Sequence, residues 1–174
     1  MEVAIISPRQ TGRPCVFKVL FVCTGNICRS PTAEGVFRHM VEERGLADRV
    51  EADSAGIGSW HVGDPPDPRS TETALARGID IRDQRARKVR PYDFEEFDLL
   101  LAMDSGHHDA MSRACPPDLL ARIRLFLEYA PDLGIRDVPD PYYGSGDGFT
   151  RVYDMIEAAS KNLLDEIEAN HLDR

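Results

Sequence analysis

The feature that most constrains this chain is the stretch KVLFVCTGNICRSPTAEGVF, residues 18–37. Its first residues form an apolar run rich in β-branched and aromatic side chains, which predicts a buried strand ending at Cys23. The next residues include Gly25 and Asn26, both of which tolerate a positive φ. An arginine, a serine and a proline follow, and proline is typical of a first helical turn. The stretch therefore predicts a strand, a tight loop and a helix.

Such a loop can bind a tetrahedral oxyanion. The backbone N–H groups of residues 24–29 can surround one point, and the helix that follows directs its positive end at the same point. These groups and Arg29 would stabilise a thiolate at Cys23. A thiolate facing a phosphate that an arginine binds through two hydrogen bonds is placed for in-line attack on phosphorus. Ser30 can donate a hydrogen bond to the sulfur and stabilise it as the leaving group of a second step.

Strands and helices alternate along the rest of the chain. Apolar runs predict three further strands, at residues 49–56, 97–103 and 121–128. Amphipathic patterns predict helices at 31–45, in the second half of 60–78, at 104–114 and at about 148–170, and prolines and glycines make 131–149 a long loop. This alternation predicts a single α/β domain with a four-stranded parallel sheet and helices on both faces. Ligands bind such sheets beyond the carboxyl ends of the strands, where the Cys23 loop lies.

Composition excludes several classes of partner. The chain has 174 residues, enough for one domain with a good core, and a net charge of −9. A chain this acidic with no basic stripe is not expected to bind nucleic acid. No apolar run is long enough to cross a bilayer, so we expect no membrane insertion.

We expect residues 1–17 to be a poorly ordered leader and residues 18–174 to form the domain.

The four cysteines are too few and too irregularly spaced for a disulfide framework. No secretory signal is visible, so we expect free thiols in a reducing cytoplasm. Cys28 can be a redox partner for Cys23 or only a filler at the start of the helix, and the sequence leaves both readings open. His107 and His108 are adjacent on a helix and point to different sides, so a metal pair is not expected. We expect no cofactor.

Phosphoester cleavage also needs an acid that protonates the leaving oxygen. Three Asp-Pro pairs are candidates, at 64–65, 67–68 and 140–141, although each can also be turn chemistry. Proline keeps the preceding residue extended, which can direct its carboxylate out of a loop. Only Asp140 is followed by two aromatic residues, so we favour it. A slot between Trp60 and Tyr142 or Tyr143 would admit a flat ring and hold its phosphate deep. That depth would disfavour phosphoserine, whose phosphate sits on a short arm.

These residues resemble the low-molecular-weight protein tyrosine phosphatase family, whose signature is a cysteine, five residues, an arginine and a serine or threonine. VCTGNICRSP matches it, and the resemblance continues through DSAG (53–56), WHVGDPPDPR (60–69), FDLLLAMD (97–104) and DPYYG (140–144). It implies that Cys23 is the nucleophile, Arg29 the phosphate clamp and Asp140 the general acid. Tyrosine-phosphorylated proteins would be the partners, with phosphate or another oxyanion in the loop.

The resemblance also implies the roles of the surrounding residues. Asn26, Ser30 and Ser54 would hold the loop in shape. Gln84 stands where bacterial members often have a histidine that is hydrogen-bonded to the loop asparagine, and we expect its amide to replace that bond. The substrate-binding set comprises the loop residues and three aromatic residues, namely Thr24, Gly25, Asn26, Ile27, Cys28, Ser30, Trp60, Tyr142 and Tyr143.

Three other functions remain as alternatives. An arsenate reductase of the same fold needs further cysteines near residues 80–95, and none occurs between Cys28 and Cys115. The protein arginine phosphatases of the family have threonine where this chain has Ile27, whose apolar side chain suits an aryl ester. A non-catalytic phosphate-binding module would need neither the Cys23 thiol nor Asp140.

Overall fold

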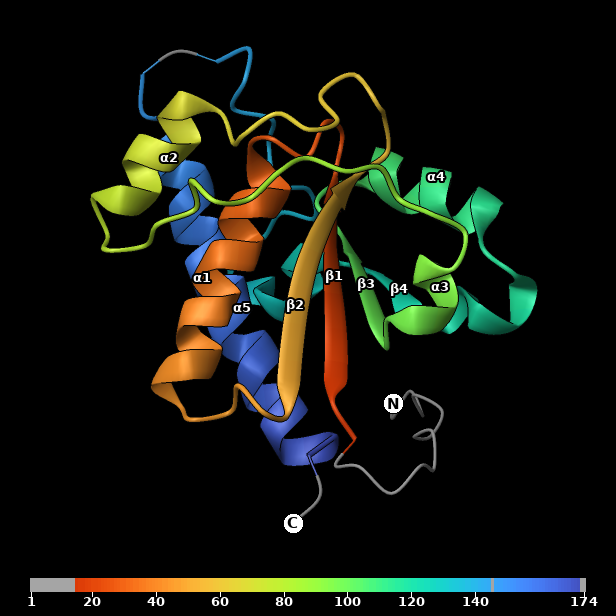
Figure 1. Ribbon diagram of the computed structural model, residues 1–174. Coiled ribbons are helices and arrows are strands. Elements are labelled where there is room, and N and C mark those ends of the chain that lie inside the picture. The colour runs from red at the N-terminus through yellow and green to blue at the C-terminus, as the bar shows by residue number, and fades with distance from the viewer. Residues whose placement is uncertain (1–14, 145, 173–174) are drawn as a thin grey trace.

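Four strands form a single sheet in the structure, a computed structural model that describes residues 15–144 and 146–172 (Figure 1). Their bounds are β1 Phe17–Cys23, β2 Val50–Gly56, β3 Leu99–Ala102 and β4 Ile123–Leu125. All neighbouring strands are parallel, in the order β2-β1-β3-β4. The predicted four-stranded parallel sheet is confirmed.

Helices cover both faces of this sheet. The α-helices are α1 Arg29–Glu43, α2 Pro68–Leu75, α3 Asp93–Glu96, α4 Ser105–Ala114 and α5 Gly148–Asn170. Short 3-10 helices span Pro117–Arg122, Phe126–Tyr129 and Pro131–Leu133. Figure 1 shows α1, α2 and α5 on one side of the sheet and α3 and α4 on the other. None of the helices in the described residues is long and apolar enough to cross a membrane.

The side chains of β1 alternate between two hydrophobic cores. Val19 and Phe21 belong to the core that includes α1 and α5. Leu20 and Val22 belong to the core that includes α3 and α4. Successive strand residues face opposite sides of a sheet. A strand covered on both faces therefore needs the unbroken apolar run that the sequence shows.

The chain leaves the sheet earlier than the sequence predicts. We expected one strand over 121–128, but β4 ends at Leu125 and a 3-10 helix follows. Phe126, Leu127 and Tyr129 all join the core beside α5. A strand would have sent alternate side chains to opposite faces, so burying all three in one core requires the chain to turn.

At the other end, β1 begins within the predicted leader. Phe17 pairs with Val50 of β2 and is 8% exposed, so the ordered domain includes this residue. Cys15 is exposed. The expectation of poor order for residues 1–14 lies outside the described residues.

The carboxyl ends of β1, β2 and β3 meet at one edge of the sheet. Cys23 is level with Gly56, and the loop after β1 lies directly against β2, with the Gly58 N–H bonded to the Thr24 carbonyl. A Cβ on Gly56 would lie 2.9 Å from that carbonyl oxygen. The close approach of the two backbones therefore requires glycine at this position.

Truncating Phe21 tests this packing. Its ring lies edge-on to Phe37 at 5.6 Å and to Phe126 at 5.2 Å between centroids, and it is fully buried. We expect Phe21→Ala to lower the free energy of unfolding by about 3–5 kcal/mol in urea titrations, because it leaves a cavity. Leu120→Ala, at a half-exposed position, should cost less than about 0.5 kcal/mol. Equal losses from both changes would contradict the assignment of the core.

Candidate active site

The loop between β1 and α1 is held in shape by Asn26, which is buried and has φ +58°. It is the one residue other than glycine with positive φ among those described. Its Oδ1 accepts a hydrogen bond from the Arg87 backbone N–H at 3.0 Å. Its Nδ2 donates to Ser30 Oγ at 2.8 Å and to Ser54 Oγ at 2.9 Å. The side chain thus fixes the loop to three separate parts of the chain.

Cys23 lies at the floor of the cavity that this loop encloses, with its sulfur 3.0 Å from Ser30 Oγ. Ser30 Oγ already accepts a hydrogen bond from Asn26. The single hydrogen of this hydroxyl can be donated to the Cys23 sulfur or to the Ala55 carbonyl oxygen, which lies 3.4 Å away. The shorter contact places a hydrogen-bond donor within reach of the sulfur.

Arg29 is 2% exposed and is held on one edge of its guanidinium group. Nη1 donates to Asp104 Oδ2 at 2.8 Å and to the Val138 carbonyl at 2.9 Å. Nη2 lies 3.4 Å from Thr24 Oγ1 and 3.6 Å from Asp140 Oδ2. Burial alone would raise the pKa of Asp104, but hydrogen bonds from Arg29 and from a backbone amide hold it below its ordinary value. Asp104 therefore stays ionised and orients the arginine.

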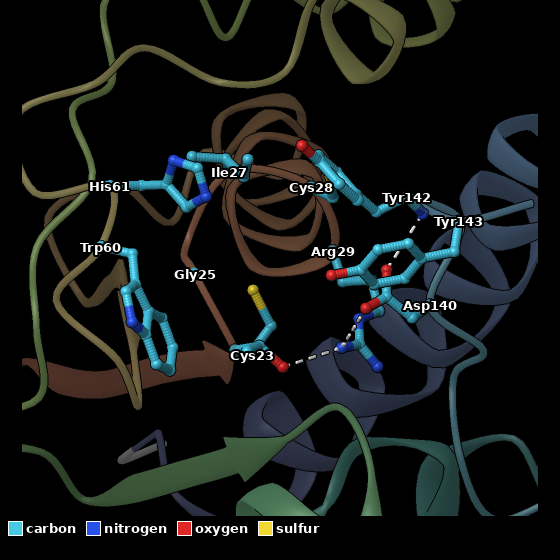
Figure 2. Close-up of a pocket in the computed structure, with 11 residues that line it drawn as sticks. Cys23, Gly25, Ile27, Cys28, Arg29, Trp60, His61, Asp140, Tyr142 and Tyr143 are labelled. Atoms are coloured by element: carbon cyan, nitrogen blue, oxygen red, sulfur yellow. Dashed lines mark hydrogen bonds and ion pairs between the residues drawn. The ribbon is translucent and has the colours of Figure 1, made fainter.

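Asp140 stands across the cavity from the loop. Its Oδ1 accepts the Tyr142 backbone N–H at 3.0 Å, a turn typical of aspartate. Its Oδ2 is the oxygen directed toward Arg29. Figure 2 shows the carboxylate above the guanidinium group, on the tyrosine side of the cavity.

Aromatic side chains form the walls of this cavity, whose volume is about 310 Å³. Figure 2 shows Trp60 on one side of the Cys23 sulfur, with Tyr142 and Tyr143 on the other. The two tyrosine rings contact each other edge-on, with centroids 4.9 Å apart. Trp60 and Tyr143 are mostly exposed, at 74% and 87%. Both side chains are therefore accessible to a ring that enters from solvent.

The family of the chain follows from comparison with known proteins. A family model described as low molecular weight phosphotyrosine protein phosphatase matches residues 18–172. The chain belongs to this family. A low molecular weight protein-tyrosine-phosphatase of Streptomyces coelicolor is 48% identical over 85% of this chain and 92% of its own length.

Solved structures agree with this assignment. YfkJ from Bacillus subtilis superposes with a TM-score of 0.87 at 38% identity, covering 92% of this chain and 99% of its own. A Drosophila protein described as an arginine phosphatase superposes with a TM-score of 0.81 at 32% identity, covering 88% of this chain and 99% of its own. The fold of this phosphatase family is therefore shared by proteins named for different substrates.

Most of the predicted site residues of this phosphatase lie together. Thr24, Gly25, Ile27 and Cys28 line the cavity with Cys23, Arg29, Asp140 and the three aromatic residues. Asn26 and Ser30 lie behind the loop instead, where their side chains bond to each other. Ser54 lies beside Asn26 and donates to Glu34 Oε2 at 2.6 Å. The buried carboxyl of Glu34 thus extends the hydrogen-bonded network under the loop.

The partner expected for Gln84 was wrong. Its Nε2 donates to the Pro31 carbonyl at 3.0 Å, at the start of α1, and does not bind Asn26. Arg87 supplies the bond to Asn26 through its backbone, because residues 87–89 pair with Gly56 at the end of β2. A backbone donor cannot be identified from the type of side chain in the sequence.

Arg87 is itself fixed by two carboxylates. Its Nη2 donates to Asp53 Oδ2 at 2.9 Å, and its Nη1 donates to Asp93 Oδ2 at 3.0 Å. Asp93 is 1% exposed. These ion pairs hold the backbone segment that binds Asn26, so they support the loop indirectly.

Gly25 serves a different purpose from the one expected. It has no positive φ in this structure. A Cβ at this position would lie 2.9 Å from His61 Cδ2, so glycine leaves room for that ring. His61 also lines the cavity, which the sequence reading missed. Its only signal was its place next to Trp60 in the loop after β2.

His107, to which the sequence reading gave no role, contacts the loop. Its Nε2 lies 2.8 Å from Thr24 Oγ1, and its Nδ1 accepts the Asp104 backbone N–H. Burial, and to a smaller extent Arg29, lowers the pKa of His107 to about 4. The ring is therefore neutral at pH 7, and with Nδ1 as acceptor its proton is on Nε2, facing Thr24.

Cys28 is a protonated thiol at neutral pH. Burial, together with the charges of Asp67 and Cys23, raises its pKa to about 12. A thiol in this form is a poor nucleophile. The described residues contain no group of three or more histidine, cysteine or acidic side chains that could hold a metal ion.

The neutral His107 predicts a pH dependence of stability. Between its ordinary pKa of 6.5 and its folded-state pKa of about 4, the unfolded chain binds a proton that the folded chain does not. The contribution of the neutral His107 ring to the free energy of unfolding is therefore fully present above pH 6.5 and is lost as the pH falls toward 4. Between pH 7.5 and 4.5, wild type should lose roughly 2–3 kcal/mol more than His107→Asn in urea unfolding. Equal losses would contradict a buried neutral ring.

Proposed function

We propose that this phosphatase hydrolyses phosphotyrosine in proteins, and small aryl phosphates, through a phosphocysteine intermediate. The observation that carries the proposal is the position of three groups around one cavity. The Cys23 sulfur lies at its floor, the Arg29 guanidinium at its edge and the Asp140 carboxylate opposite (Figure 2). Nucleophile, phosphate clamp and acid then face the same bound group.

In the first step, the Cys23 thiolate attacks the phosphorus of the bound ester. The S–P bond forms as the P–O bond to the tyrosine oxygen breaks. Asp140, in its acid form, gives its proton to that oxygen, so that phenol rather than phenolate leaves. The loop amides and Arg29 stabilise the charge that develops on the three other phosphoryl oxygens.

In the second step, Asp140 is a carboxylate and takes a proton from water. The water oxygen attacks phosphorus, a P–O bond forms and the S–P bond breaks. Inorganic phosphate and the Cys23 thiolate are released, which restores the starting state. Ser30 donates its hydrogen to the departing sulfur, as its 3.0 Å contact allows.

The walls of the cavity favour a ring. A phosphate bound at Cys23 is reached through the slot between Trp60 and the tyrosines, and a tyrosine side chain is long and flat enough to pass. Ile27 adds an apolar surface to the wall. An apolar surface suits an aryl ester better than it suits the charged guanidinium group of phosphoarginine. Phosphoarginine is the second candidate substrate, because the similar Drosophila protein is named an arginine phosphatase.

The remaining alternatives fit the site less well. A disulfide relay would need a second reactive thiol near Cys23, but Cys28 is protonated and Cys115 belongs to the core beside α3 and α4. A module that only binds phosphate would need neither a thiol at the cavity floor nor a facing carboxylate. Because the proposed reaction needs a free thiol at Cys23, we propose the reducing cytoplasm as its location.

The test compares three substrates on one protein. We expect hydrolysis of phosphotyrosyl peptides without added metal, and rates at least about 100-fold lower on matched phosphoseryl and phosphoarginyl peptides. Cys23→Ser should lower the phosphotyrosine rate by roughly 10⁴-fold or more, because a hydroxyl is a far weaker nucleophile at neutral pH. Phosphate release is measured directly.

Cys15→Ser is the matched control, since Cys15 is exposed and outside the cavity. It should keep the wild-type rate. Faster hydrolysis of the phosphoarginyl peptide would replace the proposed substrate by phosphoarginine. A Cys23→Ser variant as active as wild type would refute the nucleophile assignment.

A further inference from the structure

We propose that Arg69 is a positioning residue for Asp140, one that ties the acid to the phosphate-binding loop. This inference rests on the proposed function, because it assumes that Asp140 is the general acid. Arg69 follows the Asp67-Pro68 pair and lies in the first turn of α2, outside the described cavity lining. Its contacts run in two directions, to the loop after β1 and to the segment that carries Asp140.

The first set of contacts anchors Arg69 to the phosphate-binding loop. Asp67 accepts two hydrogen bonds from the guanidinium group, from Nε to Oδ1 and from Nη2 to Oδ2, both at 3.0 Å. The Asp67 side chain is 7% exposed, and Oδ1 also accepts the Arg69 backbone N–H at 2.8 Å. The backbone N–H of Asp67 in turn donates to the Ile27 carbonyl at 2.8 Å. The arginine is thus bound to a residue that is itself bound to the loop.

The charge on Asp67 makes this anchor firm. Burial alone would raise the pKa of this carboxyl, but the hydrogen bonds and charge of Arg69 hold it below its ordinary value. A two-point arginine–carboxylate pair also fixes the plane of the guanidinium group. The orientation of the Arg69 guanidinium group is therefore fixed where it contacts its second set of partners.

The second set of contacts holds the segment that carries the acid. Nη1 of Arg69 donates to the Tyr142 carbonyl at 3.3 Å. The guanidinium carbon lies 5.2 Å from the centre of the Tyr142 ring and 4.6 Å from that of Phe149, in the first turn of α5. Cation–ring contacts of this kind are attractive for arginine. Tyr142 is therefore held through both its backbone and its ring.

Tyr142 passes this restraint to the acid. Its backbone N–H is the donor that fixes Asp140 Oδ1 at 3.0 Å, leaving Oδ2 directed at Arg29. If Tyr142 shifts, the carboxyl group shifts with it. A displacement of about 1 Å at a reacting group can cost up to 100-fold in rate. A residue that touches no reacting atom can therefore act on the proton transfer alone.

The experiment separates this role from a structural one by its dependence on the leaving group. The value of kcat/KM reports the first step, in which Asp140 protonates the leaving oxygen. We measure it with phenyl phosphate, whose leaving group is basic, and with p-nitrophenyl phosphate, whose leaving group departs more easily. Asp140→Asn is the reference and should lower the phenyl phosphate value far more than the p-nitrophenyl phosphate value.

Arg69→Met keeps an unbranched side chain but removes the charge and the guanidinium group, which makes the two-point hydrogen bond to Asp67. We expect it to lower kcat/KM for phenyl phosphate by about 5- to 50-fold and for p-nitrophenyl phosphate by less than about 3-fold. Arg69→Lys restores the charge without the fork and should lie between Arg69→Met and wild type. In the Asp140→Asn background, Arg69→Met should add less than about 2-fold, because the acid that it positions is already gone.

Arg77 provides a matched control on the same side of the molecule. It also pairs with a carboxylate, Asp154 at 2.8 Å, and its guanidinium carbon lies 4.6 Å from the centre of the Tyr153 ring. Among the described residues, neither the ion pair nor the ring contact of Arg77 involves residues 138–144, the segment that carries Asp140. Arg77→Met should therefore leave the ratio of the two kcat/KM values as in wild type, whatever it does to thermal stability.

Three results would overturn the proposal. Arg69→Met could leave kcat/KM unchanged for both substrates, or it could lower both kcat/KM values equally. It could also lower kcat/KM in the Asp140→Asn background by as much as it does in the wild-type protein. If Asp140→Asn itself failed to change the ratio, the acid assignment would fall, and the inference about Arg69 with it. That outcome is recognised from the reference variant alone, so the two failures are distinguishable.

Discussion

The buried side-chain amide of Asn26 fixes the positions of several parts of this candidate active site relative to one another. Asn26 adopts a left-handed conformation that turns the loop after β1. Its side chain accepts from the Arg87 backbone N–H and donates to the hydroxyl groups of Ser30 and Ser54. Those partners belong to three different parts of the chain. The same amide donates to Ser30 Oγ, which lies 3.0 Å from the Cys23 sulfur. The shape of the loop and the contact between Ser30 and Cys23 therefore depend on one set of hydrogen bonds.

The sheet brings together groups from opposite ends of the chain. Arg29 binds the Val138 carbonyl, 109 residues away, and Asp104, which follows β3 and caps α4. Burying a guanidinium group is costly unless its donors are satisfied. These two partners satisfy both N–H groups of Nη1 and leave Nη2 toward Asp140. The proposed clamp, Arg29, and the proposed acid, Asp140, are thus positioned beside a parallel sheet whose strand ends meet at one edge.

The sequence predicts the local parts of this site better than the distant ones. The apolar run before Cys23 and the proline after Ser30 define a strand, a loop and a helix within 20 residues, and the structure has them. The end of β4 was missed because its aromatic residues are buried by turning, which leaves no strand periodicity. Gln84 was assigned the wrong partner because the donor is a backbone group. His107 acts through a tertiary contact that no spacing indicates.

The most direct test of the account is to find the phosphoryl group on the sulfur. Wild-type protein mixed with p-nitrophenyl phosphate is quenched within the first turnovers, and its peptides are analysed by mass spectrometry. The account predicts one phosphoryl group per chain, on Cys23, formed before steady-state release of phosphate. Continued turnover with no phosphoryl group on Cys23, or with the group on another residue, would contradict it.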